Sequence, residues 1–304
     1  MALGTRRKGR YDTGAMNARA QSMVHLKDGR RLAYAAYGTE EGIPVIALHG
    51  LPGSRLQRHP DDAITTAANV RLIVPDRPGY GFSDPLPGRR VVDWAADVAT
   101  LADTLGIRRF RVLGLSGGGP YALACAASLR DRIVRVSLVS ALGSLDAPGS
   151  TVGMMLPNRL ILRLARRAPA AVHPGLRATA ALLRRFPALY RRWLMIHVSE
   201  ADRTVLSDPA VAAMLRNDLA QAVRQGTAGV WSDLNALTSP WGFDMDQVDT
   251  PVDVWHGDSD RIVPQQMGHV LAQRLPQARW SPVTGGGHFL VIPLWREILD
   301  ALCE

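Results

Sequence analysis

Short apolar runs alternate with amphipathic segments along most of this chain. Runs rich in Val, Ile and Leu, typical of strands buried on both faces, occur at 45–48, 71–74, 110–114, 133–139, 252–255 and 279–283. Apolar residues at helical spacing predict helices at 93–105, 120–129, 265–275 and 293–302. Near the N-terminus, residues 24–26 and 31–37 flank Lys27-Asp28-Gly29 and predict a β-hairpin. Strands that alternate with helices predict an α/β fold with a mostly parallel sheet and right-handed crossovers.

Residues 146–240 break this alternation, because their apolar periodicity is helical throughout. We therefore expect an all-helical cap at 146–240, inserted after the sixth strand of the sheet. The α/β core is then expected at 22–145 and 241–304. Residues 1–21 carry several basic side chains and no apolar periodicity, so we expect a flexible basic tail there.

Candidate chemistry lies at residues 114–118, which read Gly-Leu-Ser-Gly-Gly between an apolar run and a predicted helix. This is the pattern G-x-S-x-G at a strand-to-helix turn, where a Cβ at either flanking position collides with its neighbours. The turn is expected to expose the Ser116 hydroxyl above the sheet, at a helix N-terminus. A serine hydroxyl is a poor nucleophile, so it needs a general base within hydrogen-bond reach.

Two later loops carry the side chains that such a nucleophile needs. Residues 252–264 run from an apolar strand into His-Gly-Asp-Ser-Asp, and residues 284–289 read Thr-Gly-Gly-Gly-His-Phe. Earlier in the chain, 45–53 end in His-Gly-Leu-Pro-Gly, and 75–84 match D-x-x-G-x-G-x-S. In these motifs, and in the order Ser, Asp, His, the chain resembles the α/β-hydrolase superfamily over residues 22–145 and 240–304. The resemblance implies the α/β-hydrolase fold with a helical cap and chemistry like that of serine esterases and lipases.

The resemblance also implies the role of each candidate catalytic side chain. Ser116 is expected to be the nucleophile and His288 the general base. The acid that orients the base is expected to be Asp260, the fourth residue of the turn that begins at Gly257. Asp258 competes with it in the same loop. Asp146 is a third candidate, because some relatives carry the acid after the sixth strand.

An oxyanion hole needs two backbone donors aimed at the tetrahedral intermediate. The amide of Gly117 follows the nucleophile, and the amide of Leu51 follows His49-Gly50. Pro52 has no N–H to donate, and we expect His49 to hold this loop. The predicted function is hydrolysis of a carboxylic ester through an acyl-enzyme. Hydrolysis of an amide, thioester or C–C bond, acyl transfer, and a non-catalytic ligand-binding protein on this fold remain alternatives.

The net charge of +9 is concentrated in the predicted cap. Between Asp146 and Glu200 the chain has no acidic residue and nine arginines, at 159, 163, 166, 167, 177, 184, 185, 191 and 192. Several of them follow helical spacing, with Leu160, Ile161 and Leu164, or Leu176, Ala180 and Leu183, expected on the opposite face. A solvated outer face is the simplest interpretation, and attraction to an anionic membrane surface or steering of anionic substrates are the functional alternatives. Nucleic acid is disfavoured, because no recognition module accompanies the charge.

Apolar cap residues offer either an acyl pocket or plain core packing, namely Trp193, Leu194, Met195, Trp231, Leu234 and Trp241. The partner expected at the site is a small-molecule ester or another acyl substrate. The sequence contains no metal-ligand or nucleotide-binding pattern, so we expect neither a metal nor a cofactor. Its two cysteines, Cys125 and Cys303, make no disulfide framework, and residues 1–20 lack the apolar run of a secretory signal. These features predict a cytoplasmic protein, and none of them determines its oligomeric state.

Overall fold

A computed structural model describes residues 22–146 and 149–304, which form an eight-stranded sheet in the order β1-β2-β4-β3-β5-β6-β7-β8. The tail expected at 1–21 lies outside the described residues. The strands β1 and β2 form the expected hairpin, β2 is antiparallel to β4, and the other neighbours are parallel. The strand bounds are β1 Ser22–His25, β2 Arg31–Gly38, β3 Ile43–Leu48, β4 Val70–Pro75, β5 Phe110–Leu115, β6 Ile133–Val139, β7 Val252–Gly257 and β8 Ala278–Val283.

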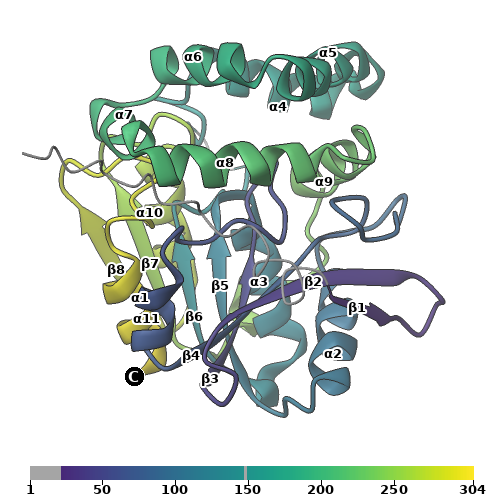
Figure 1. Ribbon diagram of the computed structural model, residues 1–304, viewed down its shortest axis with the longest axis vertical. Helices are drawn as coiled ribbons and strands as arrows, with labels where there is room; N and C mark the ends of the chain where they lie inside the picture. Colours follow the sequence, from purple (N-terminus) through teal and green to yellow (C-terminus); the bar gives the residue numbers. More distant parts are fainter. Residues whose placement is uncertain (1–21, 147–148) are drawn as a thin grey trace, which may run out of the picture.

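Helices cover both faces of the sheet, so the central strands are buried on both sides (Figure 1). On one face, apolar side chains of α2 Trp94–Thr104, α3 Gly119–Ser128 and α10 Gln265–Arg274 pack against the sheet. On the other face, α1 Asp62–Ala67 and α11 Trp295–Cys303 do so. The prediction of a mostly parallel α/β sheet is confirmed, whereas the six-residue helix α1 was not predicted from the sequence.

Between β6 and β7 the described chain forms only helices, which we call the helical insert. Its α-helices are α4 Leu156–Arg167, α5 Val172–Arg185, α6 Pro187–His197, α7 Glu200–Ser207, α8 Pro209–Ala222 and α9 Ala228–Thr238. Figure 1 shows two layers: α8 crosses the end of the sheet together with α7 and α9, and α4, α5 and α6 lie farther out. None of the described helices is both long and apolar enough to cross a membrane.

The expected apolar face of α4 is only partly correct. Ile161 and Leu164 are partly buried against the core, as expected, whereas Leu160 is 53% exposed and the buried side chains are Leu162 and Ala165. The α4 sequence has apolar residues on more than half of its circumference, so periodicity alone does not show which of them is exposed. On α5 the predicted face is confirmed, since Leu176, Ala180 and Leu183 are buried.

Candidate active site

Ser116 occupies a strained turn between β5 and α3. Its φ of 52° is uncommon for a residue with a side chain. A Cβ on Gly114 would lie 2.8 Å from the Cβ of Ala122, and one on Gly118 would overlap the backbone oxygen of Leu48. Glycine is therefore required at both flanking positions, and the turn presents the Ser116 side chain at the end of the sheet that faces the helical insert.

His288 and Asp260 form a buried acid–base pair beside this turn. The Nδ1 atom of His288 lies 2.8 Å from Oδ2 of Asp260, and the Asp260 side chain is fully buried. Asp260 also accepts hydrogen bonds from the backbone N–H groups of Ile262 and Val263, both at 2.9 Å. Burial alone would raise the pKa of Asp260, but the charges and hydrogen bonds of His288 and His256 outweigh burial and hold that pKa well below its usual range. The acid is therefore ionised at neutral pH.

The pKa of His288 moves in the opposite direction. Burial disfavours the imidazolium, but the charge and hydrogen bond of Asp260 outweigh burial, and Asp202 adds to them. The net effect raises the pKa of His288 above its ordinary value of 6.5. The ring is thus a stronger base than a free imidazole, and a proton accepted on it is stabilised by Asp260.

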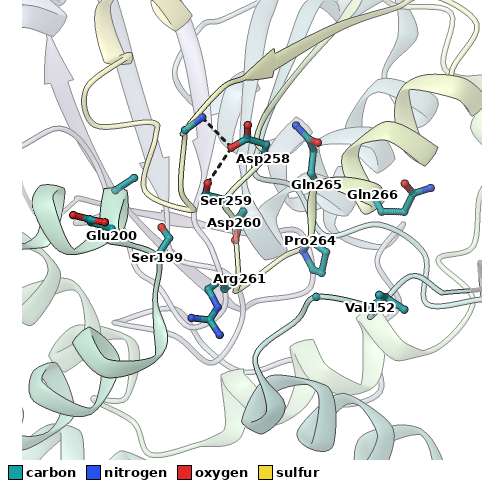
Figure 2. A pocket seen from close by; sticks show the side chains of 13 residues that line it. Val152, Ser199, Glu200, Asp258, Ser259, Asp260, Arg261, Pro264, Gln265 and Gln266 are labelled. Atoms are coloured by element: carbon teal, nitrogen blue, oxygen red, sulfur yellow. Dashed lines mark hydrogen bonds between the residues drawn. The ribbon is translucent and has the colours of Figure 1, made fainter.

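The two other candidate acids do not contact His288. Asp258 accepts hydrogen bonds from the Ser259 hydroxyl and the Gly285 N–H, at 3.0 and 2.9 Å (Figure 2). Asp146 is exposed and pairs with Arg166. Asp258 and Asp260 also line a hollow of about 780 Å³, but neither Ser116 nor His288 lines it. This hollow, although larger than the cavity over Ser116, is therefore not where we place the chemistry.

Gly117 and Leu51 lie next to each other beside Ser116. A Cβ on Gly117 would lie 3.3 Å from the backbone nitrogen of Leu51 and 2.8 Å from its Cβ. The loop that carries Leu51 is held by His49, whose Nδ1 lies 2.9 Å from the Gly50 oxygen and whose Nε2 accepts the Arg77 N–H at 3.1 Å. Burial, together with the charge of Arg77, holds the pKa of His49 well below its usual value. The ring is therefore neutral, with its proton on Nδ1.

A buried ion-pair network holds the same loop from behind. The Arg77 guanidinium donates to the backbone oxygens of His49 and Gly50, the latter at 2.8 Å, and pairs with Asp233 of α9 at 2.7 Å. Asp233 also pairs with Arg89 and accepts from Tyr80 and Tyr121. The Gly50 oxygen belongs to the same peptide group as the Leu51 N–H. Because a peptide group is planar, fixing its oxygen also fixes the direction of its N–H.

Two further buried aspartates connect the helical insert to catalytic loops. Asp202 of α7 accepts the Phe289 N–H at 2.8 Å, one residue after His288. Asp218 of α8 accepts the N–H and the hydroxyl of Ser54, both at 2.7 Å, three residues after Leu51. These aspartates, Arg77 and Asp233 were not predicted from the sequence. Each aspartate stands at an otherwise apolar position of its helix, a signal that does not by itself separate a buried side chain from a solvated one.

Ser116, Gly117, Leu51 and His288 line one cavity of about 330 Å³ under the helical insert. The other lining side chains are mainly apolar; many come from α4, α5, α6, α8 and α9, and the rest come from loops, among them Leu142, Ile262 and Phe289. Among the described residues, no Asp, Glu, Lys or Arg side chain lines this cavity. Three of the six apolar residues singled out from the sequence line it, namely Trp193, Leu194 and Leu234, whereas Met195, Trp231 and Trp241 do not.

Comparison with known proteins agrees with this architecture. The chain is 26% identical to 2-hydroxymuconate semialdehyde hydrolase of Pseudomonas putida over 290 residues, 91% of this chain and 92% of that protein. It is 27% identical to a 2-hydroxy-6-oxononadienedioate/2-hydroxy-6-oxononatrienedioate hydrolase of Cupriavidus pinatubonensis over 81% of this chain and 80% of that protein. The fold resembles an enol-lactonase from Burkholderia xenovorans, with a TM-score of 0.67, 24% identity, and coverage of 93% of this chain and 98% of that one. Residues 43–293 match the family described as alpha/beta hydrolase fold, so the chain belongs to the α/β hydrolase family.

Proposed function

We propose that this protein is a serine hydrolase that cleaves uncharged carboxylic esters through an acyl-enzyme. The observation that carries the proposal is the shared cavity, in which Ser116 lies with His288 while buried Asp260 holds the other side of the imidazole. Residues 146–240 act in this proposal as the cap over the α/β core formed by 22–145 and 241–304. Neither a metal nor a cofactor takes part.

In the proposed reaction, the Ser116 hydroxyl attacks the ester carbonyl and gives its proton to Nε2 of His288. The imidazolium is stabilised by Asp260 through the Nδ1–H hydrogen bond. The tetrahedral oxyanion accepts hydrogen bonds from the N–H groups of Leu51 and Gly117. Return of the proton to the leaving alcohol produces acyl-Ser116. Water then attacks this ester, with His288 again serving as the base, and the carboxylic acid is released.

Arg77 contributes to this mechanism by holding the peptide group that carries the Leu51 donor. Its bond to the Gly50 oxygen orients the Leu51 N–H before substrate arrives, and it also polarises the amide. Preorganised donors of this kind lower the barrier, because they do not have to rearrange as charge develops. Arg77 does not line the cavity, so it is a positioning residue.

The cavity favours an uncharged acyl group of modest size. Its volume of about 330 Å³ lies at the lower end of the range for ligand pockets, and its lining is mainly apolar. C–C bond hydrolysis is a second candidate, since sequence relatives are named as hydrolases of 2-hydroxymuconate semialdehyde and of dienedioates. A dienedioate carries two carboxylates, and burying them requires cationic or hydrogen-bonding partners. The described lining offers the polar side chains of Gln57, Asn158 and Thr179 but no cation, which favours the uncharged ester.

A substrate panel tests the proposal. We expect kcat/KM for p-nitrophenyl esters to rise from acetate to a medium-length acyl chain and to exceed the values for matched amides, thioesters and 2-hydroxymuconate semialdehyde. A higher kcat/KM for the semialdehyde would replace the ester by the C–C substrate. Turnover of none of these compounds, combined with tight binding of one, would favour a ligand-binding protein.

A further inference from the structure

The outer layer of the helical insert, α4 to α6, combines positive charge with exposed apolar side chains. Eight of its nine arginines are exposed, Arg159 being half-buried. Seven large hydrophobic side chains are exposed in the described chain. Five of them fall between the start of α4 and the end of α6, namely Leu156, Leu160, Phe186, Leu189 and Ile196, and a sixth, Val152, lies just before α4. Net positive charge and exposed apolar surface therefore coincide in one part of the protein.

Both kinds of side chain share helix faces. On α4 the residues Leu156, Leu160, Arg163 and Arg167 follow one another at spacings of four, three and four. On α6 the residues Leu189, Arg192 and Ile196 are spaced in the same way. Side chains three and four residues apart lie on the same side of a helix. Helices α4 and α6 thus each present a stripe in which leucine or isoleucine adjoins arginine.

Few of these arginines are neutralised within the protein. Among the described residues of the segment, only Arg166 has an ion pair, with Asp146. No acidic residue exists between Asp146 and Glu200. The positive potential is therefore available to a partner. Steering of an anionic substrate does not explain it well, because no charged side chain among the described residues lines the cavity.

We propose that α4, α5 and α6 dock this protein on an anionic lipid membrane. Amphipathic helices that combine arginine with large apolar side chains lie in the interface of such membranes, with the charges among the headgroups and the apolar groups below them. A second copy of the chain is disfavoured, because two such faces repel each other. A nucleic acid would satisfy the arginines through its phosphates but would leave the leucine and isoleucine side chains without a partner.

The same helices also border the cavity. Ile161, Leu176 and Leu194, one from each helix, line it from the inner side of this layer. The inner helices α7 to α9 are joined to the catalytic loops by Asp202, Asp218 and Asp233, whereas the outer helices have no acidic residue with which to make such a bond. A docked membrane therefore lies one helix layer from the cavity. Taken together with the proposed function, on which this step rests, docking at a membrane identifies the substrates as esters that partition into bilayers.

Vesicle binding by the full chain tests the docking without requiring turnover. We expect the protein to co-sediment with vesicles of phosphatidylcholine and phosphatidylglycerol, to bind phosphatidylcholine alone far more weakly, and to dissociate as salt rises from about 0.1 M to 1 M. The triple variant Arg163→Gln/Arg167→Gln/Arg192→Gln should lose about 100-fold in partition coefficient, at about fivefold per basic residue. Its turnover of a water-soluble ester should remain at the wild-type level.

A matched control removes the same charge from residues outside the helical insert. Arg108 and Arg109 precede β5, at its end away from the helical insert, and Arg274 ends α10; all three are exposed. The variant Arg108→Gln/Arg109→Gln/Arg274→Gln should keep most of the binding. Both triple variants retain the basic residues of 1–21, so any vesicle binding by those residues is the same in both variants. Equal losses in the two variants, or equal binding to both vesicle types, would overturn the proposal.

The apolar half of the proposal has its own variant. Leu160→Ser/Ile196→Ser leaves the charge unchanged, and we expect it to lower partition into anionic vesicles about tenfold. Binding to heparin, a polyanion without a bilayer, should not change. Vesicle binding that is insensitive to this variant would show that the face recognises polyanions and not membranes. If the wild-type protein turns over no ester, the proposed function is overturned, but the result of the vesicle-binding experiment still stands.

Discussion

Replacing Arg77 by methionine tests whether the buried network acts on the oxyanion loop. Arg77 and Arg89 are both almost completely buried, and both pair with Asp233. Only Arg77 also donates to the backbone oxygens of His49 and Gly50. Arg89→Met is therefore a matched control, because it removes a similar ion pair without touching the peptide that carries the Leu51 N–H.

Both variants should lose stability through the broken ion pair, and Arg77→Met should lose somewhat more, because it also removes the donors to the backbone oxygens of His49 and Gly50. Removing one partner of a buried ion pair costs about 3–5 kcal/mol, and each variant leaves Asp233 one guanidinium, so we take the lower end, about 3 kcal/mol. With ~2.1 cal/mol/K of unfolding entropy for each of the 304 residues, this loss lowers Tm by about 5 °C. Both variants should therefore remain folded at 20 °C.

Catalysis should separate the two variants. Deleting an oxyanion donor costs about 10²–10³ in kcat, and misplacing one costs less, so we expect Arg77→Met to lower kcat between about tenfold and 100-fold. KM should change little, because the cavity lining is intact. Arg89→Met should keep kcat within about threefold of wild type. The assay is kcat and KM for p-nitrophenyl butyrate at 20 °C, with Tm by calorimetry. Equal kcat in the two variants would show that Arg77 does not position the Leu51 N–H.

Three further outcomes follow from the buried carboxylates. Asp260→Asn should lower turnover by about 10⁴-fold and far more than Asp258→Asn, and the reverse order would reassign the acid. The base must be neutral to accept a proton, and the pKa of His288 is raised, so kcat/KM should fall as pH drops through a value above 6.5. Asp202→Asn removes a charge that raises this pKa, so the fall in its pH–rate profile should move to lower pH. A pH–rate profile identical to that of wild type would exclude this effect of Asp202. Burial raises the pKa of Asp218 to about 7 from 3.8, so the folded protein holds this proton more tightly than the unfolded chain. The stability that the bound proton contributes is fully present below pH 3.8 and is lost as pH rises through 7, which lowers the free energy of unfolding by up to about 4 kcal/mol. Urea unfolding should show a weaker loss of stability over this range in Asp218→Asn, and a loss equal to that of wild type would contradict the assignment.

The strands and the candidate catalytic side chains were predictable because their signals are local. Ser116 directly follows the apolar strand β5, and Asp260 and His288 lie in the loops that follow β7 and β8. Because these strands are parallel, the loops at their carboxyl ends lie at the same edge of the sheet. Glycines on either side of Ser116 mark the turn within five residues. The mechanism assigned to these residues stays a prediction until the variants are measured.

The supporting residues were not predictable in this way. Asp233 meets Arg77 across 156 positions of sequence, Asp218 meets Ser54 across 164, and Asp202 meets Phe289 across 87. An aspartate on an amphipathic helix normally indicates a solvated face, and only the packed structure shows that these three are buried. The predicted burial of Leu160 was wrong in the opposite direction, because a leucine at helical spacing was expected inside and lies on the surface.

If Ser116 is an activated nucleophile, a fluorophosphonate probe will label it. The serine oxygen attacks phosphorus, fluoride leaves with its electron pair, and the proton passes to the base. We expect stoichiometric labelling that peptide mass spectrometry locates on Ser116, together with loss of both labelling and ester turnover in a folded Ser116→Ala variant. A label on another residue, or ester turnover by Ser116→Ala within about tenfold of wild type, would show that Ser116 is not the nucleophile.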